Sequence, residues 1–126
     1  MNRAGIFDEN AMRKAVVALL KVGVKVHIAC TGGGAGVADW IWQVPGASST
    51  LVGSVFPYST GEFDRFVGRK WSDSGSSYCS EAAAIALAQE GFFRTQETCV
   101  LAGKPHERIL SVGLSAAVST ARELRG

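Results

Sequence analysis

Hydroxyl-bearing side chains gather in two short polar segments that lie about ten residues apart along the chain. The first segment contains Ser48 and Ser49, and the second contains Tyr58 and Thr60. A serine becomes a nucleophile only when a base takes its proton and an N–H pair or a positive group holds the developing oxyanion. His27, at the end of a neighbouring strand, could in principle act as this base. Helix capping and turn formation explain the serines and the threonine at least as well.

A second candidate for chemistry is the glycine-rich segment Thr31–Gly36, which follows an expected strand and precedes an expected helix. Free backbone N–H groups and the helix dipole at such a place favour an anion such as phosphate, and glycine lets the backbone approach it closely. No Gly-Lys-Ser/Thr follows, so the segment is not a P-loop. It suits either a tight turn or a phosphate cradle.

Two tryptophans, Trp40 and Trp42, are separated by one residue in a segment that we expect to be a short helix. On a helix they point about 200° apart, so one would pack inward and the other would be exposed. An exposed tryptophan near the glycine-rich segment could stack on a nucleotide base. Packing in the core or at a subunit contact is the commoner role of such a residue.

Four motifs, in this order, resemble the CinA C-terminal-domain family, which contains the nicotinamide-nucleotide amidases. The resemblance covers roughly residues 24–88. Within the family, the sequence most resembles a eukaryotic-type branch of CinA-like proteins. The motifs are Cys30-Thr31-Gly32-Gly33, Val44-Pro45-Gly46-Ala47-Ser48-Ser49, Val55-Phe56-Pro57-Tyr58-Ser59 and Ser80-Glu81.

In the amidases, the resemblance implies a serine nucleophile that falls on Ser48 and a catalytic tyrosine that falls on Tyr58. The chemistry it implies is hydrolysis of the carboxamide of nicotinamide mononucleotide, with release of ammonia and no cofactor. A small phosphorylated or nucleotide-like ligand would then contact the other matched residues, which are Thr31, Gly32, Gly33 and Ser49.

Three departures from the family pattern fall on or beside this site. The family's general-base lysine corresponds to Phe63, its Glu-Ser pair corresponds to Ile28 and Ala29, and the loop before the Pro-Gly turn is longer here. A phenyl ring cannot accept a proton, and general-base catalysis contributes about 10²–10⁴ in rate. Arg65 or Lys70 would have to replace the lysine, and arginine is a poor base.

We therefore expect a catalytically degenerate binding or interaction domain for a small phosphorylated ligand. The alternative is a nicotinamide mononucleotide amidase that uses Ser48 with another base. A third possibility is a structural or oligomerisation role with an empty cleft.

The segments that must position these residues alternate between the apolar spacing of strands, every second residue, and that of helices, every third or fourth residue. Strands that alternate with helices predict an α/β domain, a three-layer α/β/α sandwich with a mainly parallel or mixed sheet. In the longest helix, Ile85, Ala88, Phe92 and Cys99 are expected to share the buried face, with a possible kink at Gly91. The expected helices are 8–22, 37–44, 60–67 and 80–102, the expected strands are 24–28, 51–56 and 109–115, and 72–77 is an expected mobile loop.

Composition narrows the remaining choices. The 126 residues, 47% hydrophobic and 19% charged, fit one globular domain (1–126), which the resemblance suggests lacks the family's C-terminal portion. A net charge of +2 without a run of basic residues argues against binding to nucleic acid. The sequence has no apolar stretch long enough for a membrane span and no pattern of a signal peptide, so we expect a cytoplasmic location. Three cysteines and two histidines at wide spacing predict neither a disulfide nor a metal site. An open sheet edge would favour a homo-oligomer.

Overall fold

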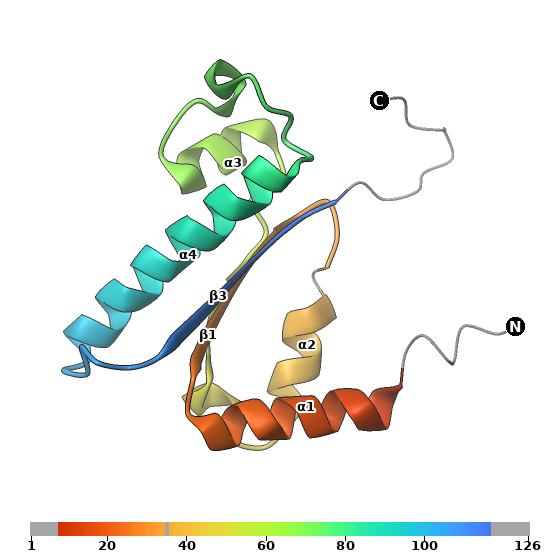
Figure 1. The fold of residues 1–126 in the computed structure, drawn as a ribbon, viewed down its shortest axis with the longest axis vertical. Helices are drawn as coiled ribbons and strands as arrows, with labels where there is room; N and C mark the ends of the chain where they lie inside the picture. The colour runs from red at the N-terminus through yellow and green to blue at the C-terminus, as the bar shows by residue number, and fades with distance from the viewer. Residues whose placement is uncertain (1–7, 35, 117–126) are drawn as a thin grey trace, which may run out of the picture.

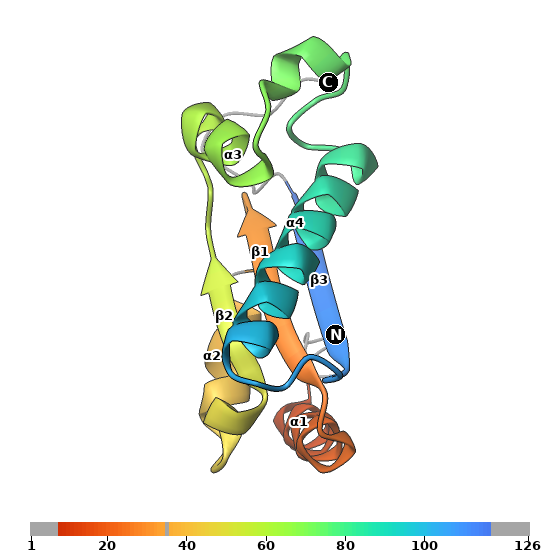
Figure 2. The same cartoon turned by 90° about the vertical axis from the view of Figure 1, so that its left-hand side faces the viewer.

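The sheet at the centre of the molecule has three parallel strands in the order β2-β1-β3. A computed structural model describes residues 8–34 and 36–116 of the chain. The strands are β1 (Lys25–Thr31), β2 (Leu51–Val55) and β3 (Ile109–Ser115). The β1–β3 ladder runs without interruption, whereas the β1–β2 ladder shifts register between Val26 and His27. Figure 2 shows β1 between its two neighbours, with β2 at the outer margin.

Helices cover both faces of this sheet. The helices α1 (Glu9–Val22) and α2 (Gly36–Trp42) lie on one face, and α3 (Thr60–Val67) and α4 (Glu81–Leu101) lie on the other (Figure 1). Alternating side chains of β1 divide between the two cores, because successive residues of a strand point to opposite faces. The predicted α/β fold, a parallel sheet flanked by helices, is confirmed. Within the described residues, no helix combines the length and apolar character needed to cross a membrane.

The termini of α1 follow from its flanking residues. The Asp8 carboxylate accepts hydrogen bonds from the backbone N–H groups of Asn10 and Ala11 at 2.9 and 3.2 Å. Gly23 ends the helix with φ 78°, a conformation that glycine adopts readily. The predicted helix is confirmed, and Val16 is its fully buried residue.

The predicted buried face of α4 is wrong in part. Ile85 is 49% exposed, and the residues that face the sheet are mostly small. The reason is close approach: a Cβ at Gly91 would lie 2.5 Å from His27 Nδ1, and a Cβ at Gly113 of β3 would lie 2.0 Å from the Ala84 carbonyl oxygen. Phe92 is also exposed, and the helix continues through Gly91 as one element. The buried residues of α4 are Ala83, Ala86, Leu87, Gly91, Thr95 and Cys99.

The segment after α3 is more ordered than predicted. Trp71–Ser74 forms a short 3₁₀ helix, η3, whose Trp71 is buried. The Asp64 carboxylate accepts a hydrogen bond from the Trp71 backbone N–H at 3.0 Å, and the Trp71 indole N–H donates to the Ser77 carbonyl at 3.0 Å. These bonds anchor the first part of the expected loop. A smaller correction concerns α3, which Ser59 rather than Thr60 caps, by accepting from an N–H of the first turn.

Candidate functional site

The sequence-predicted site residues lie at two opposite ends of the strands. Ser48 and Ser49 belong to a short 3₁₀ helix, η2 (Ala47–Ser49), which precedes β2, whereas Tyr58 follows β2 and is exposed. The five residues of β2 separate them by about 17 Å at the usual rise of a strand. Thr31 is the last residue of β1, and the glycines after it lie beyond the carboxyl end of this strand. Within the described chain, therefore, Ser48 meets neither the tyrosine nor the glycine-rich segment.

The glycine-rich segment is packed tightly against the end of β3. A Cβ at Gly32 would lie 1.7 Å from the Ala116 carbonyl oxygen, and a Cβ at Gly34 would lie 2.5 Å from Leu114 Cδ1. The Thr31 carbonyl also accepts a hydrogen bond from the Ala116 N–H at 3.1 Å. Close packing and left-handed backbone angles at both glycines account for their presence.

Ser48 lines a cavity of about 300 Å³ at the amino ends of the strands, which we call the lysine pocket. Lys25, at the start of β1, and Lys104, in the turn between α4 and β3, line it from two sides. The Lys25 ammonium donates a hydrogen bond to the Ser49 carbonyl oxygen. An ammonium has three N–H donors, so this bond leaves others available. The pocket is lined by Lys25, Ser48, Leu51, Val52, Thr98, Cys99, Ala102, Lys104 and Glu107.

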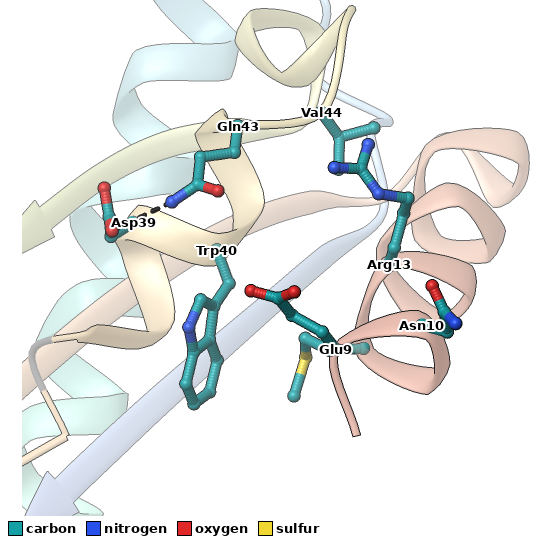
Figure 3. Close-up of a pocket in the computed structure, with 8 residues that line it drawn as sticks. Glu9, Asn10, Arg13, Asp39, Trp40, Gln43 and Val44 are labelled. Atoms are coloured by element: carbon teal, nitrogen blue, oxygen red, sulfur yellow. Dashed lines mark hydrogen bonds between the residues drawn. The ribbon is translucent and has the colours of Figure 1, made fainter. Parts of the chain in front are cut away.

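A second cavity, of about 510 Å³, also touches Ser48, and we call it the tryptophan pocket. Trp42 lines it and is 61% exposed, whereas Trp40 is half-buried, as their helical spacing predicts. The Trp42 indole N–H donates to the Asp39 carboxylate at 2.9 Å, which fixes the ring. Gln43 donates to the other oxygen of Asp39 at 3.0 Å (Figure 3).

The two serines of η2 have different surroundings. The Ser49 hydroxyl donates to the Gly46 carbonyl at 2.8 Å, which is the turn-forming role expected of such a residue. The Ser48 side chain is exposed and makes no hydrogen bond to the part of the chain that the structure describes. Ser48 is therefore the one of the two whose hydroxyl is available to a ligand.

Figure 3 shows a third cavity, of about 460 Å³, between α1 and α2. The carboxylate of Glu9 and the ring of Trp40 both extend into the space between the two helices. Arg13 and Asp39 add one charge of each sign to its lining. None of the predicted site residues lines this cavity.

The position that the resemblance assigns to the general base lies inside the core. Phe63 is 1% exposed and packs edge-to-face against Trp71 and Tyr78, with ring centroids 5.5 and 5.2 Å apart. The possible replacements, Arg65 and Lys70, are exposed on and after α3, beyond the carboxyl end of β2. Neither lines a pocket that Ser48 lines.

The other departures from the family pattern are buried as well. Ile28 and Ala29 are 1% and 0% exposed and belong to the cores on opposite faces of the sheet. A carboxylate or a hydroxyl at either position would need a buried partner. Apolar packing therefore occupies both positions at which the resemblance implies polar residues.

His27 does not supply a base for Ser48. It is 5% exposed, and its ring lies beneath α4 beside Gly53 and Gly91. Burial, followed by the charge of Arg94, lowers the pKa of His27 below its ordinary value. Its Nδ1 has no hydrogen-bond partner in the described chain. His27 lines neither pocket that contains Ser48.

Sequence reasoning missed the two lysines beside Ser48. Lys25 fits the polar position of an alternating strand, and Lys104 lies in a Gly-Lys-Pro chain break, so neither stands out along the sequence. They meet only because the carboxyl end of α4 returns to the start of β3 beside β1.

Comparisons with known proteins found a solved structure with a similar fold. No protein-family model matches the chain, and no curated protein matches its sequence. The crystal structure of the competence/damage inducible protein CihA from Agrobacterium tumefaciens superposes with a TM-score of 0.60 at 17% sequence identity. The match covers 68% of this chain and 53% of that protein, so the chain spans about half of its length. The resemblance predicted from the four motifs is thus confirmed at the level of architecture, and this chain has a CinA-like fold.

Proposed function

We propose that this chain binds a small phosphorylated, nucleotide-like ligand beside Ser48 and has lost the amidase chemistry of the CinA-like family. One observation carries the proposal. The base position is the buried Phe63, while Ser48 remains exposed beside Lys25 and Lys104. A site that offers two cations and a hydroxyl without a base is suited to binding rather than to hydrolysis.

The two lysines supply the electrostatic part of this binding. Ammonium groups donate charge-assisted hydrogen bonds to phosphate oxygens, which are stronger than bonds between neutral groups. Ser48 adds a hydroxyl donor from η2, and Glu107 on the rim can accept from a sugar hydroxyl. One carboxylate against two lysines leaves the pocket net positive, which favours an anion.

The tryptophan pocket supplies a surface for a planar ring. Trp42 is exposed there, and its bond to Asp39 fixes the plane of the indole. Stacking of a base on an aromatic side chain contributes about 1–3 kcal/mol. Because Ser48 lines both pockets, one ligand with its phosphate at the lysines can place its ring toward Trp42.

Hydrolysis at Ser48 lacks two components. The Ser48 hydroxyl has no hydrogen-bond partner among the described residues, and the Lys25 side chain donates to the Ser49 carbonyl oxygen instead. Tyr58, the other residue that the family resemblance assigns to catalysis, lies at the far end of β2. An unactivated serine hydroxyl is a weak nucleophile.

A proton NMR time course of nicotinamide mononucleotide with excess protein tests this function. We expect broadened ligand signals and no nicotinic acid mononucleotide. Lys104→Gln should weaken binding about threefold to tenfold, as loss of a partly exposed charged contact does. Lys14→Gln, which changes an exposed lysine on α1, is the matched control.

The other outcomes are equally informative. Formation of nicotinic acid mononucleotide that Ser48→Ala abolishes would establish the alternative, an altered amidase. Sharp, unchanged ligand signals, repeated with other nucleoside monophosphates, would refute the ligand class.

A further inference from the structure

The outer side of α4 carries large apolar side chains, although the side that faces the sheet carries mostly small ones. In Figure 2, α4 lies in front of the sheet, and no other described element crosses its outer side. Two neutral amides of this outer side, Gln89 and Gln96, are also exposed. The large apolar side chains are between 38% and 57% exposed, and they belong to Ile85, Phe92, Phe93 and Val100. We call these six residues the α4 stripe.

The α4 stripe occupies one face of the helix. At 100° per residue its members fall within an arc of about 100°. The stripe itself contains no charged residue, and Glu90 and Glu97 flank it. Acidic flanks disfavour an anionic membrane surface, which attracts lysine and arginine beside an apolar helix face. A contiguous apolar face of this kind is therefore expected to meet another protein surface.

The α4 stripe is symmetric along the helix, with an aliphatic residue, an amide and a phenylalanine in each half. Its centre lies between Phe92 and Phe93, and each glutamine is three residues from the nearer phenylalanine. Ile85 precedes Phe92 by seven residues, and Val100 follows Phe93 by seven. A two-fold axis brings the same patch of two subunits together, so a patch with this symmetry is complementary to a second copy of itself.

We infer that the α4 stripe binds the α4 stripe of a second copy of this chain, with the two helices antiparallel. Ile85 then packs on Val100 of the second copy, and Phe92 packs on its Phe93. Each Gln89 meets a Gln96, and because an amide both donates and accepts hydrogen bonds, this pair needs no charged partner. Antiparallel packing also places the positive end of each helix beside the negative end of the other.

The area of the α4 stripe sets the strength of this association. At about 150–250 Å² for each aromatic side chain, the exposed parts of Phe92 and Phe93 amount to about 140–240 Å². With the other four side chains, each copy hides about 400–500 Å², or about 800–1,000 Å² in the pair, whereas stable complexes bury about 1,200–2,000 Å². The dimer is therefore weak and reversible.

This contact is separate from the proposed ligand site. No residue of the α4 stripe lines the lysine pocket or the tryptophan pocket. The dimer also differs from the one that an open sheet edge would form, because helices rather than strands meet in it.

The first test is sedimentation velocity of the full chain at increasing concentration, where the sedimentation coefficient should rise. Phe93→Lys brings two ammonium groups to the centre of the contact, so it should weaken association by at least about tenfold. Leu101→Lys is the matched control, because Leu101 is an 88% exposed residue of α4 outside the stripe, and it should leave association unchanged. Circular dichroism checks that both variants are folded.

A protein that stays monomeric at every concentration would overturn the inference and leave the α4 stripe to a different protein. Equal association of wild type and Phe93→Lys would also overturn it, because the dimer would then use another surface.

The second test fixes the direction of the helices with one double variant, Gln89→Glu with Gln96→Lys. Antiparallel packing sets unlike charges opposite each other, so association should strengthen about twofold to tenfold, as for two exposed ion pairs. Added salt should remove this gain. Weaker association would contradict the antiparallel arrangement, since parallel helices would set like charges opposite each other.

Discussion

The close approach of α4 to the sheet makes a quantitative prediction for Gly113 of β3. In Gly113→Ala, the new methyl group would lie 2.0 Å from the Ala84 carbonyl oxygen and 2.7 Å from the Ala88 nitrogen. Both are backbone atoms of a helix, so α4 must move as a unit to restore ordinary contact. Overpacking of this kind costs about 1–3 kcal/mol, and alanine recovers about 0.5–1 kcal/mol of backbone entropy. Because both contacts are with backbone atoms, the cost should be near the upper end of this range, which leaves a net loss of about 2 kcal/mol of unfolding free energy.

Gly91→Ala and Gly61→Ala complete the series. At Gly91 the new methyl group meets the His27 ring and the Ser111 hydroxyl at 2.5 and 2.7 Å, and these side-chain atoms can yield further than backbone can. The gain in helix propensity offsets about 1 kcal/mol there, so the net loss should be smaller than for Gly113→Ala. Gly61, in α3, has no neighbouring atom within 4 Å, so its substitution should stabilise the protein by about 0.5–1 kcal/mol.

Urea unfolding followed by far-ultraviolet circular dichroism measures all three variants. The midpoints should rank Gly61→Ala above wild type, then Gly91→Ala, then Gly113→Ala, with unchanged slopes. A Gly113→Ala variant as stable as wild type would refute the helix–sheet spacing described above.

Two further predictions concern buried titratable groups. The pKa of His27 is lowered by burial and by Arg94, so below its ordinary value of 6.5 the unfolded chain takes up a proton that the folded chain does not. The unfolding free energy should therefore fall as the pH drops below about 6.5. In urea titrations between pH 7 and pH 5, His27→Gln should flatten this dependence on pH. A slope that survives the substitution would assign it to other groups. Burial raises the pKa of the Cys30 thiol, so iodoacetamide at pH 8 should label the exposed Cys79 first, as peptide mass spectrometry would show. Faster labelling of Cys30 would contradict its burial.

Local patterns predicted most of the fold. The Asp8 cap, the stripe of apolar residues after it and Gly23 define α1. The alternation of Val24, Val26 and Ile28 with Lys25 and His27 predicts β1, although the structure buries five consecutive residues of this strand. The buried face of α4 could not be predicted from apolar spacing, because the helix presents small residues to the sheet. That choice depends on Gly113, which is distant in sequence from the helical residues that it admits.

The candidate site was predictable only in part. Ser48 stands out by its motif, and its separation from Tyr58 follows once the intervening residues are assigned to a strand. Lys25 and Lys104 come from segments that only the strand order brings together. Phe63 occupies the position that the resemblance assigns to the general base, and the structure buries its ring in the core.

The most direct test of the central claim is a ¹⁵N-labelled NMR titration with nicotinamide mononucleotide. Binding at the lysine and tryptophan pockets predicts the largest amide shifts at Lys25, Trp42, Ser48 and Lys104, with the ligand chemically unchanged. The largest shifts at Gly32, Gly33 and Tyr58, or conversion of the ligand to nicotinic acid mononucleotide, would contradict the account.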